Sequence, residues 1–509
     1  MSVAQESVKK VYDYDRQLVQ EKLLKGFKSA RSEATVADLA GATGLPLQQI
    51  EAELPAVADE FGARMKVTEK GDILYSFPDG MKSRYKGFGP SAKRFLRKVK
   101  KWAVEAAKAV FKVWIMVMLV GYFVLFLALA LFAMVASVAM QQGGGGRSDS
   151  RDNRRGGGGL GGLWLTTSLF NSLVRIWFYS ELFKDPNERY RQSAARKERH
   201  PLHKSIFSHV FGDGDPNQNW PEIEKKAVVA FLQTHKGIMT MPEFMAITGA
   251  DPVEAELAIN KYLLEFEGSP EVSDNGTLYF TFPKLLARVG TTPDIMGSSV
   301  ALKRLRKFSS NTAKADNVFR LVNVFNLAFG GYFLYNAATV GSAFYVNTVK
   351  GLALRGGFSF IYSATGYLFQ MLGSSNPVPG IQWGLGVVPI LFSGLFFAIP
   401  VIRLLREKLG NEKVKFENLR RIVYRNILGT RDVFRPESLA SPIEEARPSD
   451  ASATEKIAKR LAAWAGAEPT SGGYDYREIR RLQEDAEKIR SAVNPDSFSP
   501  GRTIFDTES

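Results

Sequence analysis

Cysteine is absent from the 509 residues of the chain, and histidine occurs only 4 times. The lack of cysteine excludes disulfide bonds, thiolate metal sites and cysteine nucleophiles. No GxxxxGK[ST], HExxH or GxSxG motif occurs either, so the usual signatures of nucleotide binding, zinc proteolysis and serine hydrolysis are missing. We therefore expect a protein that is not an enzyme and that uses no cofactor.

Charged residues are scarce in several long apolar stretches. Residues 113–140 are uncharged throughout, and this run exceeds the roughly 20 residues with which a helix crosses a ~30 Å hydrocarbon layer. Residues 321–349 and 356–402 are also uncharged, and the turn-rich GSSNPVPG sequence at 373–380 divides the second of these. Residues 160–180 are long enough to cross but contain Arg175. The pattern predicts a mainly α-helical, multi-pass membrane protein.

Positive charges gather beside these stretches. The formal charge of the chain is +15, whereas four basic segments together carry +24, which leaves −9 elsewhere. These segments are 81–112, 191–204, 301–314 and 403–425. Because basic segments flank membrane helices on the cytoplasmic side, we expect four spans, with the N-terminus, the 184–317 region and the C-terminus in the cytoplasm. Residues 358–372 would be re-entrant or interfacial, and a fifth span is the alternative.

Side chains near and within the membrane form two candidate groups. Those expected to contact anionic lipid headgroups are Lys93, Arg94, Arg97, Lys98, Lys100, Lys101, Lys303, Arg304, Arg306, Lys307, Arg403 and Arg406. Those expected inside the membrane are Arg175, Asn323, Asn326 and Asn336. Intramembrane polar groups are candidates for function, and hydrogen bonding between helices is the alternative role. No Asp or Glu occurs in the four apolar stretches, so proton-coupled transport lacks its usual groups.

An internal repeat organises the polar parts of the chain. With a constant offset of 205 positions, residues 35–78 align without gaps with residues 240–283. The identical pairs include Thr35 with Thr240, Gly44 with Gly249, and Glu51 with Glu256. Each copy predicts three helices followed by a β-hairpin, with the threonine as the N-cap of the second helix and the glycine as its stop.

This order of three helices and a terminal hairpin resembles the winged-helix superfamily. The resemblance covers about 65 residues in each copy and implies that the third helix binds DNA in the major groove. The third helices, however, are acidic and contain a single basic residue, Lys261. Because phosphates repel acidic residues, we expect a face for protein interaction, formed by Glu51, Glu53, Asp59, Glu60, Glu254 and Glu256.

One oxygen-rich segment has the spacing of a calcium loop of the EF-hand type. Its candidate ligands are Asp213, Asp215, Asn217, Asn219 and Glu224. Gln218 stands where such a loop needs glycine for its sharp turn, and Pro216 also interrupts it. A turn leading into a helix is the favoured interpretation, and we expect no metal site.

The predicted fold class is thus a mainly α, multi-pass membrane protein with two small α+β winged-helix-like domains in an internal duplication. Its expected parts are winged-helix-like domains at 1–80 and 221–290, basic segments at 81–112, 184–220 and 291–317, membrane regions at 113–183 (with a loop at 141–159) and 318–404, and a tail at 405–509 with helical segments.

The predicted function is non-enzymatic. We expect a scaffold, assembly or sensory-coupling protein in the inner membrane of a bacterium. Its partners would be anionic headgroups, an unidentified cytoplasmic protein and, as an alternative, further copies of the chain; nucleic acid is not expected. A membrane-tethered DNA-binding regulator is the first alternative function, and a channel or transporter built from duplicated two-span units is the second.

Overall fold

The computed structural model describes residues 12–29, 33–78, 80–81, 88–142, 201–289, 302–349, 351–439, 446, 451–494 and 500–507. The chain is mainly helical, with small sheets, and forms two compact units, each assembled from separate segments. Unit 1 comprises Met1–Arg94, Asp215–Arg306 and Lys408–Ser509, and unit 2 comprises Phe95–Gly214 and Lys307–Glu407.

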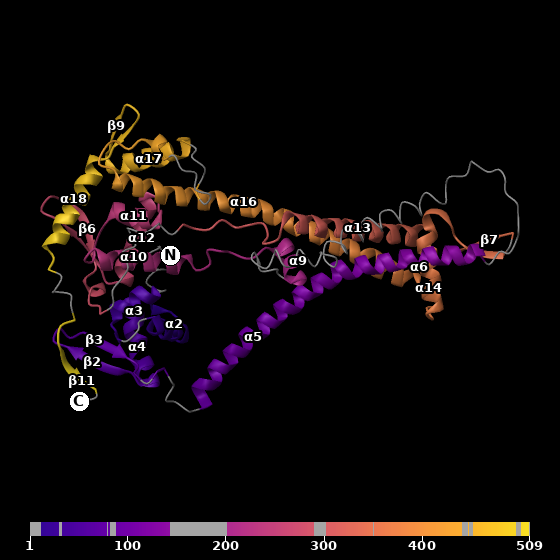
Figure 1. The fold of residues 1–509 in the computed structure, drawn as a ribbon, viewed down its shortest axis with the longest axis horizontal. Helices are drawn as coiled ribbons and strands as arrows, with labels where there is room; N and C mark the ends of the chain where they lie inside the picture. The colour runs from indigo at the N-terminus through magenta and orange to yellow at the C-terminus, as the bar shows by residue number, and fades with distance from the viewer. Residues whose placement is uncertain are drawn as a thin grey trace, which may run out of the picture. The chain divides into compact units, whose positions relative to one another are not determined.

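The first repeat in unit 1, here called module 1, runs from α2 to β3 (Figure 1). Its elements are α2 (Arg16–Ser29), β1 (Glu33–Ala34), α3 (Val36–Thr43), α4 (Leu47–Phe61), β2 (Arg64–Thr68) and β3 (Ile73–Ser76). Thr35 caps α3 by accepting a hydrogen bond from the backbone N–H of Asp38, and Gly44 ends the helix in the left-handed conformation, with φ +67°. Both caps confirm the sequence expectation. The short strand β1, which pairs with β3, was not predicted.

The second repeat, module 2, has the same order of elements. They are α10 (Trp220–Thr234), β4 (Ile238–Thr240), α11 (Met241–Thr248), α12 (Pro252–Glu265), β5 (Ser269–Val272) and β6 (Leu278–Thr281). The strands lie in the order β4-β6-β5, which matches β1-β3-β2 in module 1. Thr240 and Glu243 form a capping box, and Gly249 ends α11 with φ +67°. The two modules therefore share the capping residues at both ends of their second helix, as well as their topology.

The C-terminal part of unit 1 packs onto both modules. Its elements are α17 (Ala451–Ala465), β9 (Glu468–Thr470), β10 (Gly473–Asp475), α18 (Arg477–Ala492) and β11 (Thr503–Asp506). Strand β11 extends the sheet of module 1 by pairing with β2, and Arg64 binds Asp506 there. On α18, Arg490 binds the capping carboxylate of Glu243 in module 2, with a shortest N–O distance of 2.7 Å. The sequence predicted helical segments in this tail but neither contact.

Unit 2 contains most of the apolar helix surface. Its helical elements are the larger part of α5 (Phe88–Met116), the π-helical η1 (Val117–Gly121), α6 (Tyr122–Gln142), α9 (Leu202–Phe211), α13 (Ala313–Thr339), α14 (Phe360–Met371), α15 (Val378–Gly380), the π-helical η5 (Ile381–Val387) and the first part of α16 (Val388–Gly429). A hairpin of β7 (Tyr345–Thr348) and β8 (Gly351–Leu354) precedes α14. A short 3-10 turn lies at Gly357–Ser359 in unit 2, and two more lie in unit 1, at Pro283–Leu285 and Pro436–Ser438.

Three helices of the described residues are long and apolar enough to cross a membrane. They are Trp102–Val138, Ala313–Thr339 and Val378–Gly429. The predicted spans at 113–140 and 321–349, and the last part of the apolar stretch 356–402, fall on these helices, although the second helix ends ten residues early, before the β7–β8 hairpin. Helix α14 has 12 residues, which at 1.5 Å per residue is too short to cross. The predicted span at 160–180, with Arg175, lies outside the described residues.

Candidate functional site

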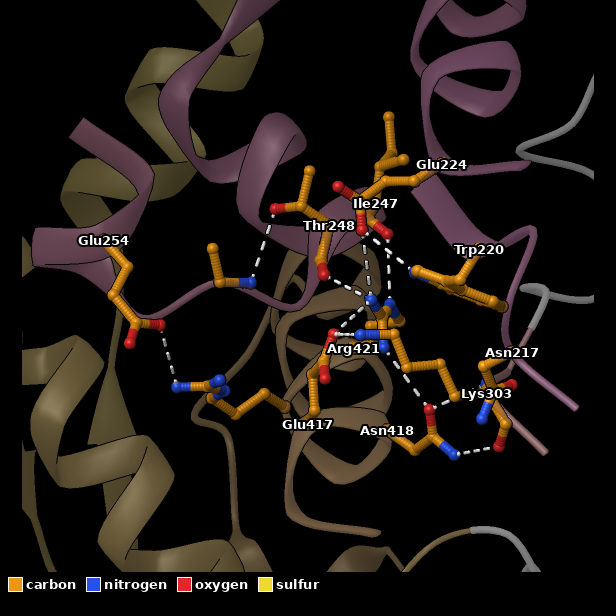
Figure 2. Close-up of polar contacts among 12 residues, drawn as sticks. Asn217, Trp220, Glu224, Ile247, Thr248, Glu254, Lys303, Glu417, Asn418 and Arg421 are labelled. Atoms are coloured by element: carbon orange, nitrogen blue, oxygen red, sulfur yellow. Dashed lines mark hydrogen bonds and ion pairs between the residues drawn. The ribbon is translucent and has the colours of Figure 1, made fainter. Parts of the chain in front are cut away.

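A buried polar cluster of unit 1 surrounds Arg421, in the last part of α16 (Figure 2). The Arg421 side chain is fully buried, and its guanidinium lies 4.8 Å from the centre of the Trp220 ring. It donates to Glu417 Oε1 at 2.8 Å and to Asn418 Oδ1 at 3.3 Å. A longer contact of 3.5 Å reaches Glu224 Oε2 on α10. The buried cation is thus compensated by carboxylates from two helices.

Arg421 also completes the C-terminus of α11. It donates to the main-chain oxygens of Ile247 and Thr248, which belong to the last carbonyls of α11 that no helical N–H can reach. Gly249 follows in the left-handed conformation, and a Cβ built there would lie 2.7 Å from Arg421 Cγ and 2.9 Å from Glu417 O. Glycine is therefore needed at position 249 for two reasons: the backbone is left-handed there, and α16 approaches too closely for a Cβ.

Three asparagines hold the basic segment 303–306 beside this cluster. Each side-chain amide both donates to a carbonyl and accepts from the N–H of the same residue. Asn217 pairs in this way with Arg304, Asn411 with Arg306, and Asn418 with Lys303. The six donor–acceptor distances lie between 2.7 and 3.0 Å. This pairing fixes the main chain of the segment without using its charges.

The charges of the segment are also used within unit 1. Lys303 Nζ lies 2.5 Å from Glu417 Oε1 and faces the Trp220 ring, and Arg306 lies 2.6 Å from Asp215. The Arg306 hydrogen bond holds the pKa of Asp215 below its usual range. The headgroup contact of Lys303 stays a prediction, and its ammonium already pairs with the Glu417 carboxylate within the chain. Arg304 is exposed.

Arg403 is a second residue of the headgroup prediction with partners inside the chain. It lies in unit 2, where its guanidinium donates to the main-chain oxygens of Ser208, His209 and Phe308 at 2.6 to 3.0 Å. Two of these oxygens belong to the last turn of α9, so Arg403 completes the end of a helix as Arg421 does. Lys307 and Arg406 are exposed. The predicted residues between 93 and 101 lie on α5, and their side chains are outside the described part of the chain.

The acidic face of α12 is partly covered by residues of the same chain. Arg420 lies 3.7 Å from both Asp251 and Glu254, and Arg460 of α17 lies 2.6 Å from Asp251. Trp464 of α17 donates to Glu256 at 2.9 Å. Two of the predicted interaction residues, Glu254 and Glu256, thus bind arginine and tryptophan side chains.

The predicted interaction residues of α4 differ from those of α12 in their exposure and partners. Glu51 and Asp59 are exposed and Glu60 is half-buried. Glu53 is 4% exposed and accepts hydrogen bonds from Tyr14 and Gln20. The placement of Glu53 on an exposed face is therefore wrong, because it fixes the N-terminal segment to α4. A groove of about 660 Å³ lies beside α4. It is lined by Glu51, by residues 70–73 at the turn between β2 and β3, and by Lys284.

The oxygen-rich segment 213–224 uses its side chains in hydrogen bonds. Asp213 accepts from Ser310, and Asp215 and Asn217 bind the segment 303–306 as described above. Glu224 lies within α10, where it accepts from Trp220 at 3.0 Å and from Tyr262 at 3.2 Å. Asn219 is the N-cap residue of α10. No group of three or more metal-binding side chains occurs among the residues that the structure describes.

The three predicted intramembrane asparagines are buried in unit 2. Asn323 donates to Ser393 O at 3.1 Å and Asn326 to Leu119 O at 2.8 Å, so both link α13 to another helix. Asn336 donates to Tyr332 O of its own helix at 2.9 Å.

His209 is a buried titratable group that the sequence did not single out. It is 1% exposed, its Nδ1 lies 3.1 Å from Asp316 Oδ1, and the rings of Phe308, Phe319 and Phe396 surround it. Burial lowers the pKa of His209, the Asp316 carboxylate opposes this change, and the charges of Arg320 and Arg403 add to it. A neutral imidazole is therefore favoured in the folded state.

Comparison with known proteins gives one relative. No protein-family model matches the sequence, and no solved structure matches it. The chain is similar to a protein of Arabidopsis thaliana that is described as uncharacterised and chloroplastic. The two are 23% identical over 419 residues, which cover 80% of this chain and 72% of the plant protein. The aligned stretch is longer than either unit, so the similarity extends into both.

Substitution of Gly249 tests whether α16 packs closely on the end of α11. Gly249→Ala and Gly276→Ala each place a Cβ at positive φ, but only the first Cβ would collide with neighbouring atoms. We expect Gly276→Ala to cost about 1 kcal/mol of unfolding free energy and Gly249→Ala about 2 kcal/mol or more. Denaturant unfolding of the full chain measures both, and equal costs would contradict the packing.

Substitution of His209 tests the buried imidazole. Because the folded pKa lies below the usual value of about 6.5, protons bind more readily to the unfolded chain as the pH falls. The melting temperature should therefore drop between pH 7.5 and pH 5.5, and His209→Asn should reduce that drop. His203→Asn, on the same helix and half-buried, is the matched control and should leave the drop unchanged. An undiminished drop in His209→Asn would rule out this role.

Proposed function

We propose that the protein is a non-enzymatic, multi-pass membrane protein that presents two winged-helix-like modules to the cytoplasm as protein-binding surfaces. The inner membrane of a bacterium is the proposed location. The observation that carries the proposal is the chemistry at α12, where Asp251, Glu254 and Glu256 bind two arginines and a tryptophan from other helices of the chain.

The topology of the modules supports their winged-helix character. Each module has a helix, a short strand, two helices and a hairpin, and the first strand pairs with the last. The third helix of such a fold is its usual recognition element. In both modules that helix presents carboxylates, which favour the positively charged and aromatic side chains of a protein over the phosphates of DNA.

The continuity of α16 supports a coupling role. This helix runs from Val388 to Gly429, and its first part belongs to one of the three helices that are apolar enough to cross a membrane. Its last part carries Arg420 and Arg421, which bind module 2. The end of α11 and the start of α12 are therefore bound to the same helix that carries an apolar segment.

A photo-crosslinking amino acid at Ala52 or Ala56, both exposed on α4, tests the protein-binding surface in native membranes. We expect protein adducts at both positions, reduced about fivefold or more by Glu51→Lys, because reversal of a complementary charge weakens association. The same amino acid at Lys488, exposed on α18, is the control and should be unaffected by that substitution.

A second experiment, on the detergent-solubilised protein, tests the DNA-binding alternative. The full chain is needed, because β11 extends module 1 and α18 packs on module 2. Binding of duplex DNA at low salt by the detergent-solubilised protein, together with an absence of protein adducts at α4, would contradict the proposal.

A further inference from the structure

The sheet of module 1 includes a strand that lies far away in the sequence. Strand β11 pairs antiparallel with the outer edge of β2 (Figure 1). The N–H of Thr507 donates to Met65 O, and the N–H of Met65 donates to Thr507 Oγ1, both at 3.2 Å. The outer edge of β2 is therefore a strand-addition site, and β11 occupies it.

Strand β11 adds no buried side chain to the sheet. Ile504 is 65% and Phe505 is 56% exposed, whereas β3 buries Leu74 and Tyr75. The pairing with β2 is also irregular between Thr503 and Phe505, and such an irregularity interrupts the ladder of hydrogen bonds. Because burial of apolar side chains is the main source of stability, we expect β11 to leave β2 at a small cost in free energy.

An ion pair selects the strand that binds at this edge. Arg64 Nε lies 2.9 Å from Asp506 Oδ1, and Arg64 Nη2 lies 3.1 Å from Asp506 Oδ2. Such a bidentate contact between arginine and a carboxylate is strong and fixes the geometry of the pair. The site thus takes an extended segment with a carboxylate at this position, and the β11 of any copy of the chain has one.

The second module has the same edge in a form that resists strand addition. At the offset of 205 positions, Pro270 of β5 corresponds to Met65 of β2, and both lie in the same register with the neighbouring strand. Proline has no N–H, so β5 lacks the donor that Met65 presents to β11. Ser269 also stands in place of Arg64. Among the strands that the structure describes, β5 pairs with β6 alone. One module is thus guarded against an added strand, and the other accepts one.

We propose that β11 is exchanged between two copies of the chain, so that the β11 of each copy pairs with the β2 of the other. Each copy carries one strand and one site, and a reciprocal exchange closes a two-fold dimer. The contacts are those seen within one copy, including the ion pair of Arg64 with Asp506. The exchange is independent of the protein-binding surfaces proposed above, because it uses the edge of a sheet rather than α4 or α12.

Single cysteines test the exchange in native membranes, since the natural sequence contains none. Two differently tagged forms of the full chain are produced together, one with Met65→Cys and the other with Thr507→Cys. The Cα atoms of paired residues on neighbouring strands lie about 5.5 Å apart, which suits a disulfide. Mild oxidation should therefore give a product that carries both tags. Pro270→Cys in place of Met65→Cys is the matched control on β5 and should give none.

Reversal of the ion pair makes the test directional. One form carries Arg64→Glu with Met65→Cys, and the other carries Asp506→Arg with Thr507→Cys. Like charges then oppose the pairing of β11 with β2 within each copy, whereas opposite charges favour it between the two forms. The product with both tags should increase about fivefold or more over that of the forms with natural charges.

Met65→Cys and Thr507→Cys together in one chain show whether the two thiols can be joined at all. If this double variant forms its disulfide but the two single variants give no mixed product, the proposal is overturned. A mixed product that does not increase on charge reversal would also overturn it. Absence of a disulfide in the double variant would contradict the pairing of β11 with β2 itself.

Discussion

The structure depends on an arginine of α16 bound to the carbonyl end of another helix. In unit 1 this arginine is Arg421 on α11, and in unit 2 it is Arg403 on α9. In both places a glycine permits the close approach, since a Cβ at Gly249 or Gly212 would collide with the arginine. A guanidinium suits this role because its fixed set of donors can satisfy several carbonyls at once. Each arginine also faces an aromatic ring, at 4.8 Å and 4.5 Å.

These contacts change the meaning of the basic segments. Counted along the sequence, 301–314 and 403–425 are positively charged segments beside apolar stretches, as expected for lipid headgroups. In the structure Lys303, Arg403 and Arg421 have protein partners instead. The charge of these segments thus serves two purposes: part of it fixes α16 to its neighbours, and exposed residues such as Arg406 remain available to the surroundings.

Local features could be predicted from the sequence and long-range pairs could not. The caps at Thr35 and Gly44 follow from the preferences of single residues, and the repeat follows from identities at a constant offset. The role of Arg421 could not be predicted, because a basic residue looks the same in the sequence whether it faces lipid or protein. The four-residue spacing of Leu419, Val423 and Ile427 beside it is the sequence pattern of a helix with a buried face. Strand β11 has 4 residues, too few for a pattern, and its partner strand lies at the other end of the chain.

The most direct test of the coupling account is cysteine crosslinking in native membranes. Because the sequence contains no cysteine, only the introduced thiols of this chain can react. Arg420→Cys and Glu254→Cys together place two thiols where an ion pair of 3.7 Å now lies. A short bifunctional thiol reagent should join them. Lys408→Cys with Glu254→Cys, about 18 Å further along α16, should give no product. Absence of the first crosslink, or equal yields for the two pairs, would contradict the binding of α16 to module 2.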